Sequence, residues 1–349
     1  MEGRPFVCGD GADAARLGSS TVRKSTPKGI AHMCQRLLVL LAVSVLLPTV
    51  AMAKLCGDDV AGQDISCACG DTVVSDVQLT NDPVAREECP ADGLIVRAID
   101  SPHAVTIDLA GKTLHGSGHG VGVLILDGGP GGAHLISSAG AATIEGFRDG
   151  IVARGARSVA LIDRLTVVKS KQDGVRIEAR GYKVQATEVR DSGRHGFSLG
   201  GNGFRVTNTR ALNSRQFGYT VTGQNGTVGL PGAGNTATGN GAAGFHLMGR
   251  GHSLVEGVAE DGKDGIRLNV SHATITRCRV ESNHRDGLSG KANDSSLTGN
   301  RATGNGNSGI ALRGQRNRDG GGNAGGANRG KRRHRQAAQC TINGRDCLP

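Results

Sequence analysis

Carboxylates, arginines, histidines and a lysine recur at fixed distances from a repeated glycine in this chain. The residue directly before that glycine is acidic or an imidazole in five repeats, at Asp149, Asp173, His195, Asp264 and Asp286. Two residues after the glycine stand Arg176, His246 and Arg267, and four residues after it stands Lys291. Arginine pairs bidentately with carboxylates, so such a set could hold an acidic polysaccharide. We therefore take as candidate catalytic or binding residues Asp173, Arg176, His195, His246, Asp264, Arg267, Asp286 and Lys291. An ordinary solvated strand face would show the same polar stripe.

Two kinds of polysaccharide chemistry are compatible with these residues. A lyase neutralises a uronate with a metal ion or an arginine and removes the α-proton with a Lys or Arg base. A glycosidase places two carboxylates about 5 to 9.5 Å apart, which one or two strand spacings of about 4.8 Å would satisfy. The repeat brings Asp264 beside Asp286, where Ca²⁺ or the guanidinium groups of Arg267 and Arg285 would compensate the charge. Asp-Gly is equally an ordinary turn sequence, so spacing alone does not separate a site from turn chemistry.

The elements that must position these side chains follow from the glycine, which recurs every 21 to 26 residues and most often every 22. Its positions, each followed by an aliphatic or aromatic residue, are Gly150, Gly174, Gly196, Gly218, Gly244, Gly265, Gly287 and Gly309. A period near 22 fits one coil of a β-solenoid or a leucine-rich repeat. Alternating stretches such as 174–178 predict a strand after each glycine, and further short alternating runs leave no room for a helix. Because the leucine-rich consensus is absent, we predict an all-β fold, a parallel β-helix.

The coil motif, an Asn or Ser followed four residues later by Gly and an aliphatic residue, resembles a known family. It is similar to the right-handed parallel β-helix repeat proteins of the pectate-lyase-like superfamily, in particular secreted bacterial members, over roughly residues 70 to 325. The resemblance implies a single right-handed parallel β-helix (β-solenoid) with a substrate groove along the outer face of the strand after the glycine. This scaffold carries lyases, hydrolases, epimerases, adhesins and maturation factors, so it does not decide the chemistry. The chain has no Trp for a pectate-lyase motif, and 100–104 is only an interrupted form of the Asp-Pro-His-Asp string of mannuronan epimerases.

Three recurring positions have structural explanations. The polar residue four before the glycine should hydrogen-bond from coil to coil as a ladder. The members of this column are Ser170, Ser192, Ser214, Asn240, Asp261, Asn283 and Asn305. The glycines should supply a positive φ where the chain turns into the strand. Phe197, Tyr219 and Phe245 should stack inside the bore as core residues.

The chain divides into a leader, two caps and the coils between them. We expect residues 1–53 to be a leader with a Sec signal peptide at 33–53, since an apolar run at 37–47 precedes an Ala-x-Ala cleavage pattern, whereas residues 1–32 fit no part of a signal. Residues 54–110 would form a Cys-containing N-terminal cap with the first coils, and 111–312 the regular coils. Residues 313–349 would form a Gly/Arg-rich last coil or linker and a C-terminal cap. We expect a secreted or periplasmic protein without a transmembrane anchor.

Cysteines gather at the two ends of the expected β-helix. Cleavage after Ala53 leaves seven cysteines, of which Cys56, Cys67, Cys69 and Cys89 precede the coils. Cys340 and Cys347 close a small loop near the C-terminus. An oxidising compartment makes disulfides plausible, and a solenoid needs covered ends, so both groups predict stapled caps. The zinc alternative for Cys67 and Cys69 lacks the required ligand spacing. Cys278 should be buried and unpaired.

The net charge of +10 comes from the two ends of the chain. Residues 1–53 and 313–335 are basic, while acidic and basic residues balance elsewhere. We therefore expect no nucleic-acid partner, and we expect a monomer. Our first hypothesis is an exported β-helix that binds extracellular or envelope polysaccharide, acidic in particular, with or without lyase, hydrolase or epimerase activity. The alternatives are a non-catalytic structural or adhesive surface solenoid, or a periplasmic maturation factor, for which a Met- or His-rich copper cluster is missing. No cofactor is predicted from the sequence, and Ca²⁺ is the candidate metal ion for Asp264 and Asp286.

Overall fold

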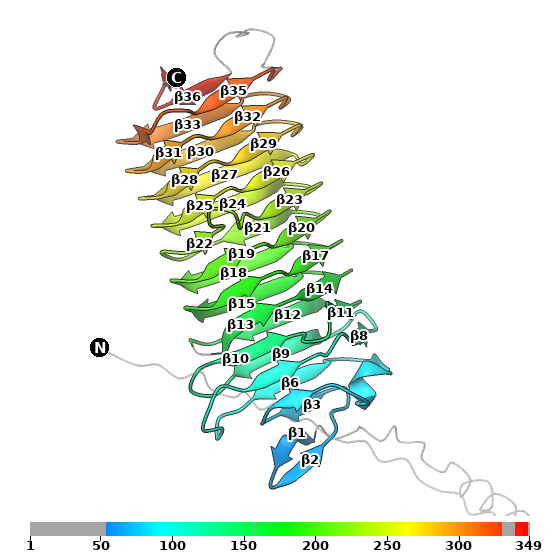
Figure 1. Ribbon diagram of the computed structural model, residues 1–349. Helices are drawn as coiled ribbons and strands as arrows, with labels where there is room; N and C mark the ends of the chain where they lie inside the picture. Colours follow the sequence, from blue (N-terminus) through cyan, green and yellow to red (C-terminus); the bar gives the residue numbers. More distant parts are fainter. Residues whose placement is uncertain (1–53, 157, 330–338, 348–349) are drawn as a thin grey trace, which may run out of the picture. The chain divides into compact units, whose positions relative to one another are not determined.

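The described part of the chain is built almost entirely of short parallel strands (Figure 1). The computed structural model describes residues 54–156, 158–329 and 339–347. Within them the single helix is the 3₁₀ turn η1 (Pro83–Ala85). The expected leader and the basic cluster at 331–335 lie outside the described residues.

The strands form three long sheets. Sheet 1 has 15 strands in the order β2 (Gln63–Ile65), β1 (Leu55–Val60), β3 (Asp71–Val73), β6 (Leu94–Arg97), β9 (Val121–Asp127), β12 (Asp149–Arg154), β15 (Val175–Arg180), β18 (Phe197–Asn202), β21 (Phe217–Val221), β24 (Ala243–Arg250), β27 (Asp264–Ser271), β30 (Leu288–Asn293), β33 (Ile310–Gln315), β36 (Cys340–Ile342) and β37 (Arg345–Asp346). Sheet 2 has 11 strands, β4 (Val77–Gln78), β7 (Thr106–Asp108), β10 (Ala133–Ile136), β13 (Val159–Asp163), β16 (Lys183–Gln185), β19 (Arg205–Thr207), β22 (Thr227–Val228), β25 (Ser253–Val255), β28 (Thr274–Thr276), β31 (Ser296–Thr298) and β34 (Arg318–Asp319). Sheet 3 also has 11 strands, β5 (Glu88–Cys89), β8 (Thr113–Gly116), β11 (Ala142–Glu145), β14 (Leu165–Val168), β17 (Glu188–Arg190), β20 (Arg210–Leu212), β23 (Thr236–Thr238), β26 (Val258–Glu260), β29 (Arg279–Glu281), β32 (Arg301–Thr303) and β35 (Ala324–Gly326).

Each coil contributes one strand to each sheet, as β15, β16 and β17 do in turn. The following coil adds the next strand to all three sheets, and the pairing is in register. Val175 pairs with Phe197, and Phe197 pairs with Tyr219. Equivalent residues of successive coils therefore lie one above the other, about one strand spacing of 4.8 Å apart. The predicted all-β parallel β-helix is confirmed.

The residue after each repeated glycine points into the bore, as the alternation predicted. Phe197, Tyr219 and Phe245 are fully buried. Their ring centroids are 4.8 Å apart between Phe197 and Tyr219 and 4.7 Å apart between Tyr219 and Phe245, with nearly parallel planes. The Tyr219 hydroxyl lies 2.9 Å from Oγ1 of Thr209, so the buried phenol has a polar partner. The aromatic core stack is confirmed.

The repeated glycines are needed for a different reason from the one predicted. None of the eight has a φ in the left-handed region. A Cβ on Gly174 would instead lie 2.1 Å from Cγ1 of Val189 and 2.8 Å from the carbonyl oxygen of Gly196. The glycine is where the next coil approaches closest, and the expectation of positive φ was wrong. Residues just before the polar ladder adopt positive φ instead, for example Lys169 (55°) and Asp191 (56°).

The polar column forms the predicted ladder at its asparagines, with one change of register, whereas the hydroxyl groups of Ser170, Ser192 and Ser214 are buried without a hydrogen-bond partner. Asn283 Nδ2 donates to Oδ1 of Asn305 at 3.0 Å, and Asn305 Nδ2 donates to Oδ1 of Asn328 at 3.0 Å. Between Gly244 and Gly265 the repeat is only 21 residues long. In this coil Gly262 occupies the ladder position, because its N–H donates to Oδ1 of Asn283. Asp261 takes the positive-φ position of that corner (54°), so including it in the ladder was wrong. The asparagines of the ladder satisfy buried backbone groups at their corners, as Oδ1 of Asn240 does by accepting the N–H of Ser214 at 3.0 Å.

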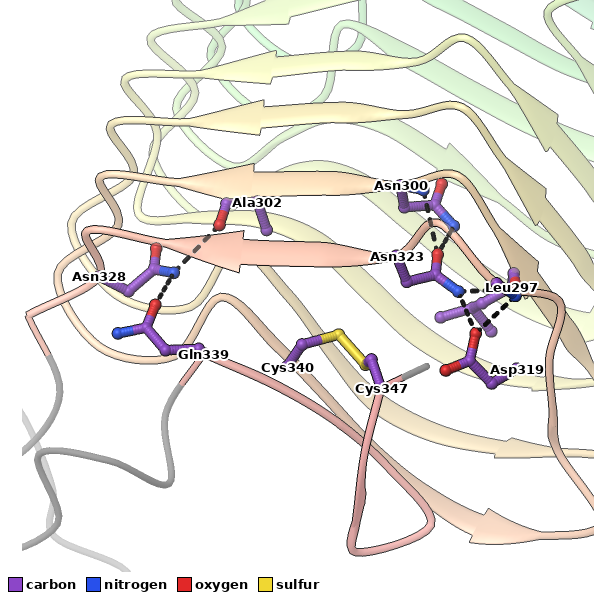
Figure 2. The surroundings of a disulfide bond; sticks show 10 residues. Leu297, Asn300, Ala302, Asp319, Asn323, Asn328, Gln339, Cys340 and Cys347 are labelled. Carbon is purple, nitrogen blue, oxygen red and sulfur yellow. Dashed lines mark hydrogen bonds between the residues drawn. A yellow bond between two sulfur atoms is a disulfide. The ribbon is translucent and has the colours of Figure 1, made fainter. Parts of the chain in front are cut away.

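Disulfides close both ends, as predicted. At the N-terminal end they join Cys56 to Cys67 and Cys69 to Cys89. Figure 2 shows the third, between Cys340 and Cys347, beside the last polar ladder residues. The coils continue beyond residue 312, because β33, β34 and β35 form a further complete coil. Cys278 is buried and unpaired, as expected.

Candidate functional site

The predicted cationic and imidazole residues lie on the outer face of sheet 1, which we define by the outward side chains of β12 to β33. Arg176, Ser198, Thr220, His246, Arg267 and Ser289 form one continuous column of Cα partners. Lys291 belongs to the next column, beside Asn269 and Arg313. The strand register therefore brings together residues that are far apart in the sequence.

The aspartates before the glycines bridge successive coils. Oδ1 of Asp173 accepts the backbone N–H of His195 at 3.2 Å, and Oδ1 of Asp264 accepts that of Asp286 at 3.3 Å. Asp149 and Asp286 accept the N–H of the next coil in the same way, at 3.2 Å each. This contact gives the Asp-Gly pairs a structural role, which is to satisfy one backbone donor in each coil.

Both carboxylate oxygens of Asp173 make hydrogen bonds within the protein. Its side chain is completely buried, and both oxygens accept from the guanidinium of Arg194, with Nε to Oδ1 at 2.8 Å. The hydrogen bond to Asp173 raises the pKa of Arg194 above its ordinary value. A carboxylate held in this way has no free oxygen to attack a substrate or to transfer a proton.

Asp264 lies between two arginines, as the spacing suggested. Its Oδ2 is 3.9 Å from Nε of Arg267, and its Oδ1 is 3.7 Å from Nε of Arg285. Asp286 accepts a hydrogen bond of 2.6 Å from the side-chain amide of Asn307. No group of three or more His, Cys, Asp or Glu suited to a metal ion exists in the described part of the chain. Arginine supplies the counter-charge at Asp264.

A stack of three rings interrupts the aspartate column at the middle coils. His195 and Phe217 occupy the position before the glycine, and His246 leans onto Phe217 from the next strand. The ring centroids are 5.3 Å apart between His195 and Phe217 and 4.5 Å apart between Phe217 and His246. All three side chains are half-buried, so each keeps an exposed edge. We call His195, Phe217 and His246 the ring stack.

The two histidines of the ring stack are held neutral by burial. Burial lowers the pKa of His195, although Asp173 opposes the shift. Burial, Arg267 and His195 together lower the pKa of His246. Nδ1 of each ring is buried without a hydrogen-bond partner. Since an unpaired buried N–H would be costly, the proton of each neutral ring belongs on Nε2, which leaves an N–H donor at the exposed side.

Two cations stand side by side further along the same face. Lys291 and Arg313 are direct Cα partners on β30 and β33. Both are exposed, and neither has an acidic partner among the described residues. They line an open groove of about 450 Å³ together with Asp286, Ser289, Asn307 and Ser308, so the groove holds one carboxylate beside the two cations. We call Lys291 and Arg313 the cation pair.

The family comparison agrees with this architecture. The family described as "Right handed beta helix region" matches residues 149–319, which span the ring stack and the cation pair. The chain is a right-handed parallel β-helix protein. No curated protein sequence matches it.

Three solved structures illustrate what this β-helix is similar to. The A-module of mannuronan C-5 epimerase AlgE4 from Azotobacter vinelandii is 16% identical, with 69% of this chain and 71% of that chain covered and a TM-score of 0.47. The catalytic unit of a GH87 α-1,3-glucanase from Streptomyces thermodiastaticus strain HF3-3 is 14% identical, with 75% and 64% covered and a TM-score of 0.39. PfbA, a surface adhesin of Streptococcus pneumoniae, is 11% identical, with 73% and 77% covered and a TM-score of 0.30.

Sequence reasoning found most of the charged residues of this β-helix face but missed Phe217. The available signal was a ring at the position that carries Asp in other coils, in two successive repeats, at His195 and Phe217. The period alone did not show that His246 would lean onto Phe217, because the two occupy different positions in their repeats.

The described disulfides fit an extracellular or periplasmic β-helix, since such bonds persist in oxidising compartments. No helix in the residues that the structure describes is long and apolar enough to cross a membrane.

Proposed function

We propose that this β-helix protein is exported and binds extracellular or cell-envelope polysaccharide along the outer face of sheet 1. The ring stack is the observation that carries the proposal. Phe217 is a half-buried aromatic ring on an outer strand face, with an imidazole on either side at 5.3 and 4.5 Å.

The chemistry of the ring stack suits a sugar. The exposed edge of the Phe217 ring, between the two imidazoles, offers an apolar surface against which the C–H groups of a pyranose can pack. The two neutral imidazoles offer Nε2–H donors to hydroxyl groups beside that surface. Ser198 lies in the same outward column and adds a hydroxyl group. Because the rings are held by stacking and half-burial, little side-chain freedom is lost when a ligand binds.

The same residues favour binding over turnover. A hydrolase of the type considered needs two free carboxylates flanking the reacting bond. Asp173 is bound by Arg194, and Asp264 lies between Arg267 and Arg285. Arg176 pairs with Glu178 at 2.7 Å. We therefore propose that the candidate residues act as ligand contacts and scaffold, and that the protein is a glycan-binding solenoid.

The experiment is a binding titration of the protein with acidic and neutral polysaccharides, comparing wild type with Phe217→Ala. Loss of the ring should weaken binding about tenfold or more, which corresponds to about 1.4 kcal/mol. Leu212→Ala is the matched control, because Leu212 is a half-buried outward side chain of β20 in the preceding coil segment, on sheet 3. Equal binding by wild type and Phe217→Ala, or silence across the polysaccharides, would refute the proposal.

Turnover and export have separate tests. Incubation with uronate polymers, followed by the absorbance of unsaturated uronates, should remain flat with Ca²⁺ and with EDTA. Rising absorbance would contradict the non-catalytic assignment.

Export predicts that the protein recovered from the periplasm or the medium begins at Lys54, which N-terminal sequencing would detect.

A further inference from the structure

The ring stack contains two histidines whose Nδ1 atoms are enclosed by the protein. Nδ1 of His195 and Nδ1 of His246 are both buried without a hydrogen-bond partner. The two rings flank Phe217, with centroids 5.3 Å from it for His195 and 4.5 Å for His246. A neutral imidazole with its proton on Nε2 fits this place, because Nδ1 then carries no N–H that needs an acceptor.

A protonated imidazole does not fit the same place. An imidazolium has an N–H on both nitrogens, so the buried Nδ1 of each ring would become an unpaired donor on a charged group, which is costly. Water reaches this donor when the ring turns out of the stack. Protonation of the imidazoles therefore works against their contact with Phe217.

The charges around His195 are already paired with each other. Its neighbours are Asp173 and Arg194, and both carboxylate oxygens of Asp173 accept hydrogen bonds from the guanidinium of Arg194. On the neighbouring strand β15, Arg176 is paired with Glu178. Burial lowers the pKa of His195, Asp173 opposes this shift, and Arg194 adds to it. An imidazolium at this position would share a carboxylate that Arg194 already holds.

The charges that face His246 are positive. Burial lowers its pKa most, followed by Arg267 on β27 and by His195. Thr220, its Cα partner on β21, is uncharged. Asp264, the carboxylate nearest to Arg267, lies 3.9 Å from Nε of that arginine and has a side chain that is only 5% exposed. An imidazolium at His246 would therefore be repelled by Arg267 and, once His195 is protonated as well, by its partner in the stack.

From this geometry we infer that the ring stack is a pH-sensitive switch, closed when its imidazoles are neutral and opened when they are protonated. In the closed state His195 and His246 hold Phe217 between them and form the surface against which sugars pack. In the open state the imidazolium rings turn toward water, and that surface is lost. The consequence for ligands rests on the proposed glycan-binding function, since opening would weaken the binding of a polysaccharide in acidic surroundings.

The opening can be measured on the full-length protein without a ligand. The chain has no Trp, so Phe217→Trp places a single fluorescent reporter in the stack. Between about pH 8 and about pH 4, a range that spans the ordinary imidazole pKa of about 6.5, its emission should shift to the red as the indole becomes exposed. Circular dichroism at each pH checks that the β-helix stays folded. The matched control carries His195→Gln and His246→Gln beside the reporter, and its emission should not change with pH.

Three results would overturn the inference. They are an unchanged emission, an equal shift in the control, and a shift that appears only together with unfolding. Should the reporter variant not fold, histidine ¹⁵N spectra of the wild-type protein decide the same question. They should show the Nε2–H form at about pH 8, and protonation of His195 and His246 at lower pH should be accompanied by loss of the ring-current shift from Phe217.

Binding separates this inference from the proposed function. Laminarin, an uncharged glucan, is the probe, so the charge of the polymer does not change with pH. Wild type should bind it at least tenfold more weakly at about pH 4.5 than at about pH 7.5, and the double Gln variant should lose this pH dependence. If the reporter shifts but laminarin binds equally at both pH values, the switch stands and the ring stack is not the glycan site. If Phe217→Ala weakens laminarin binding but the reporter does not shift, the proposed function stands and the switch fails. Absence of laminarin binding at both pH values counts against the proposed function, and the emission alone then decides the switch.

Discussion

Replacing Gly174 by alanine should destabilise the β-helix through close contact between coils. The added methyl would lie 2.1 Å from Cγ1 of Val189, 3.0 Å from Oγ of Ser192 and 2.8 Å from the carbonyl oxygen of Gly196. The valine can rotate away. The carbonyl cannot move freely, because it accepts the N–H of Val175 at 2.9 Å.

The magnitude follows from these contacts. Overpacking in a tight interior costs about 1–3 kcal/mol, and a strained backbone hydrogen bond adds about 1 kcal/mol. Lower entropy of the unfolded alanine chain offsets about 0.4–1 kcal/mol. We therefore expect the free energy of unfolding to fall by about 2–3 kcal/mol for Gly174→Ala.

Gly181→Ala is the matched control, since Gly181 has a φ of +66° and no atom lies within 4 Å of the position that its added methyl would take. Gly181→Ala should lower the free energy of unfolding only because alanine is disfavoured in the left-handed conformation, by about 1–2 kcal/mol. The lower entropy of the unfolded alanine chain again reduces this loss. Urea unfolding followed by circular dichroism measures both variants, with the slope checked for a change in cooperativity. The reasoning would be refuted if Gly174→Ala were no more destabilising than Gly181→Ala.

Three further predictions concern buried polar groups. Asn305→Ala should lower the unfolding free energy by about 2–4 kcal/mol, since Asn283 and Asn328 in the two adjacent coils each lose a hydrogen bond to the Asn305 side chain. Asn305→Ser should recover part of this loss, and urea titration of both variants tests it. Because burial lowers the pKa values of His195 and His246, the unfolded chain binds more protons below about pH 6.5, so stability should fall as pH drops from there toward the folded pKa values. Replacing both histidines by Gln should flatten that part of the stability profile, and an unchanged slope would contradict the assignment. Burial raises the pKa of the Cys278 thiol to about 12, so a disulfide reagent at neutral pH should label this cysteine only after unfolding, and rapid labelling of the native protein would count against its burial.

The repeat and its consequences could be predicted from the order of the residues alone. The spacing of glycine, apolar and polar residues near a period of 22 predicted a parallel β-helix, and alternation after each glycine predicted which side chains face the bore. Phe197, Tyr219 and Phe245 stack as expected for this reason. Cysteines at both ends predicted stapled caps, because a solenoid must cover its ends.

Contacts across the coils could not be predicted in this way, because they depend on neighbours in space. A repeat period cannot show a contact such as that between Gly174 and the carbonyl of Gly196. The sequence therefore suggested positive φ as the reason for the glycine, and this was wrong. The 21-residue step moved Asp261 out of the ladder, since the corner is set by hydrogen bonds to the next coil and not by distance from the glycine. Phe217 is the Cα partner of Ala243 in the next strand, yet its ring lies against His246, three residues further along that strand. Lys291 meets Arg313 only because the strands pair in register.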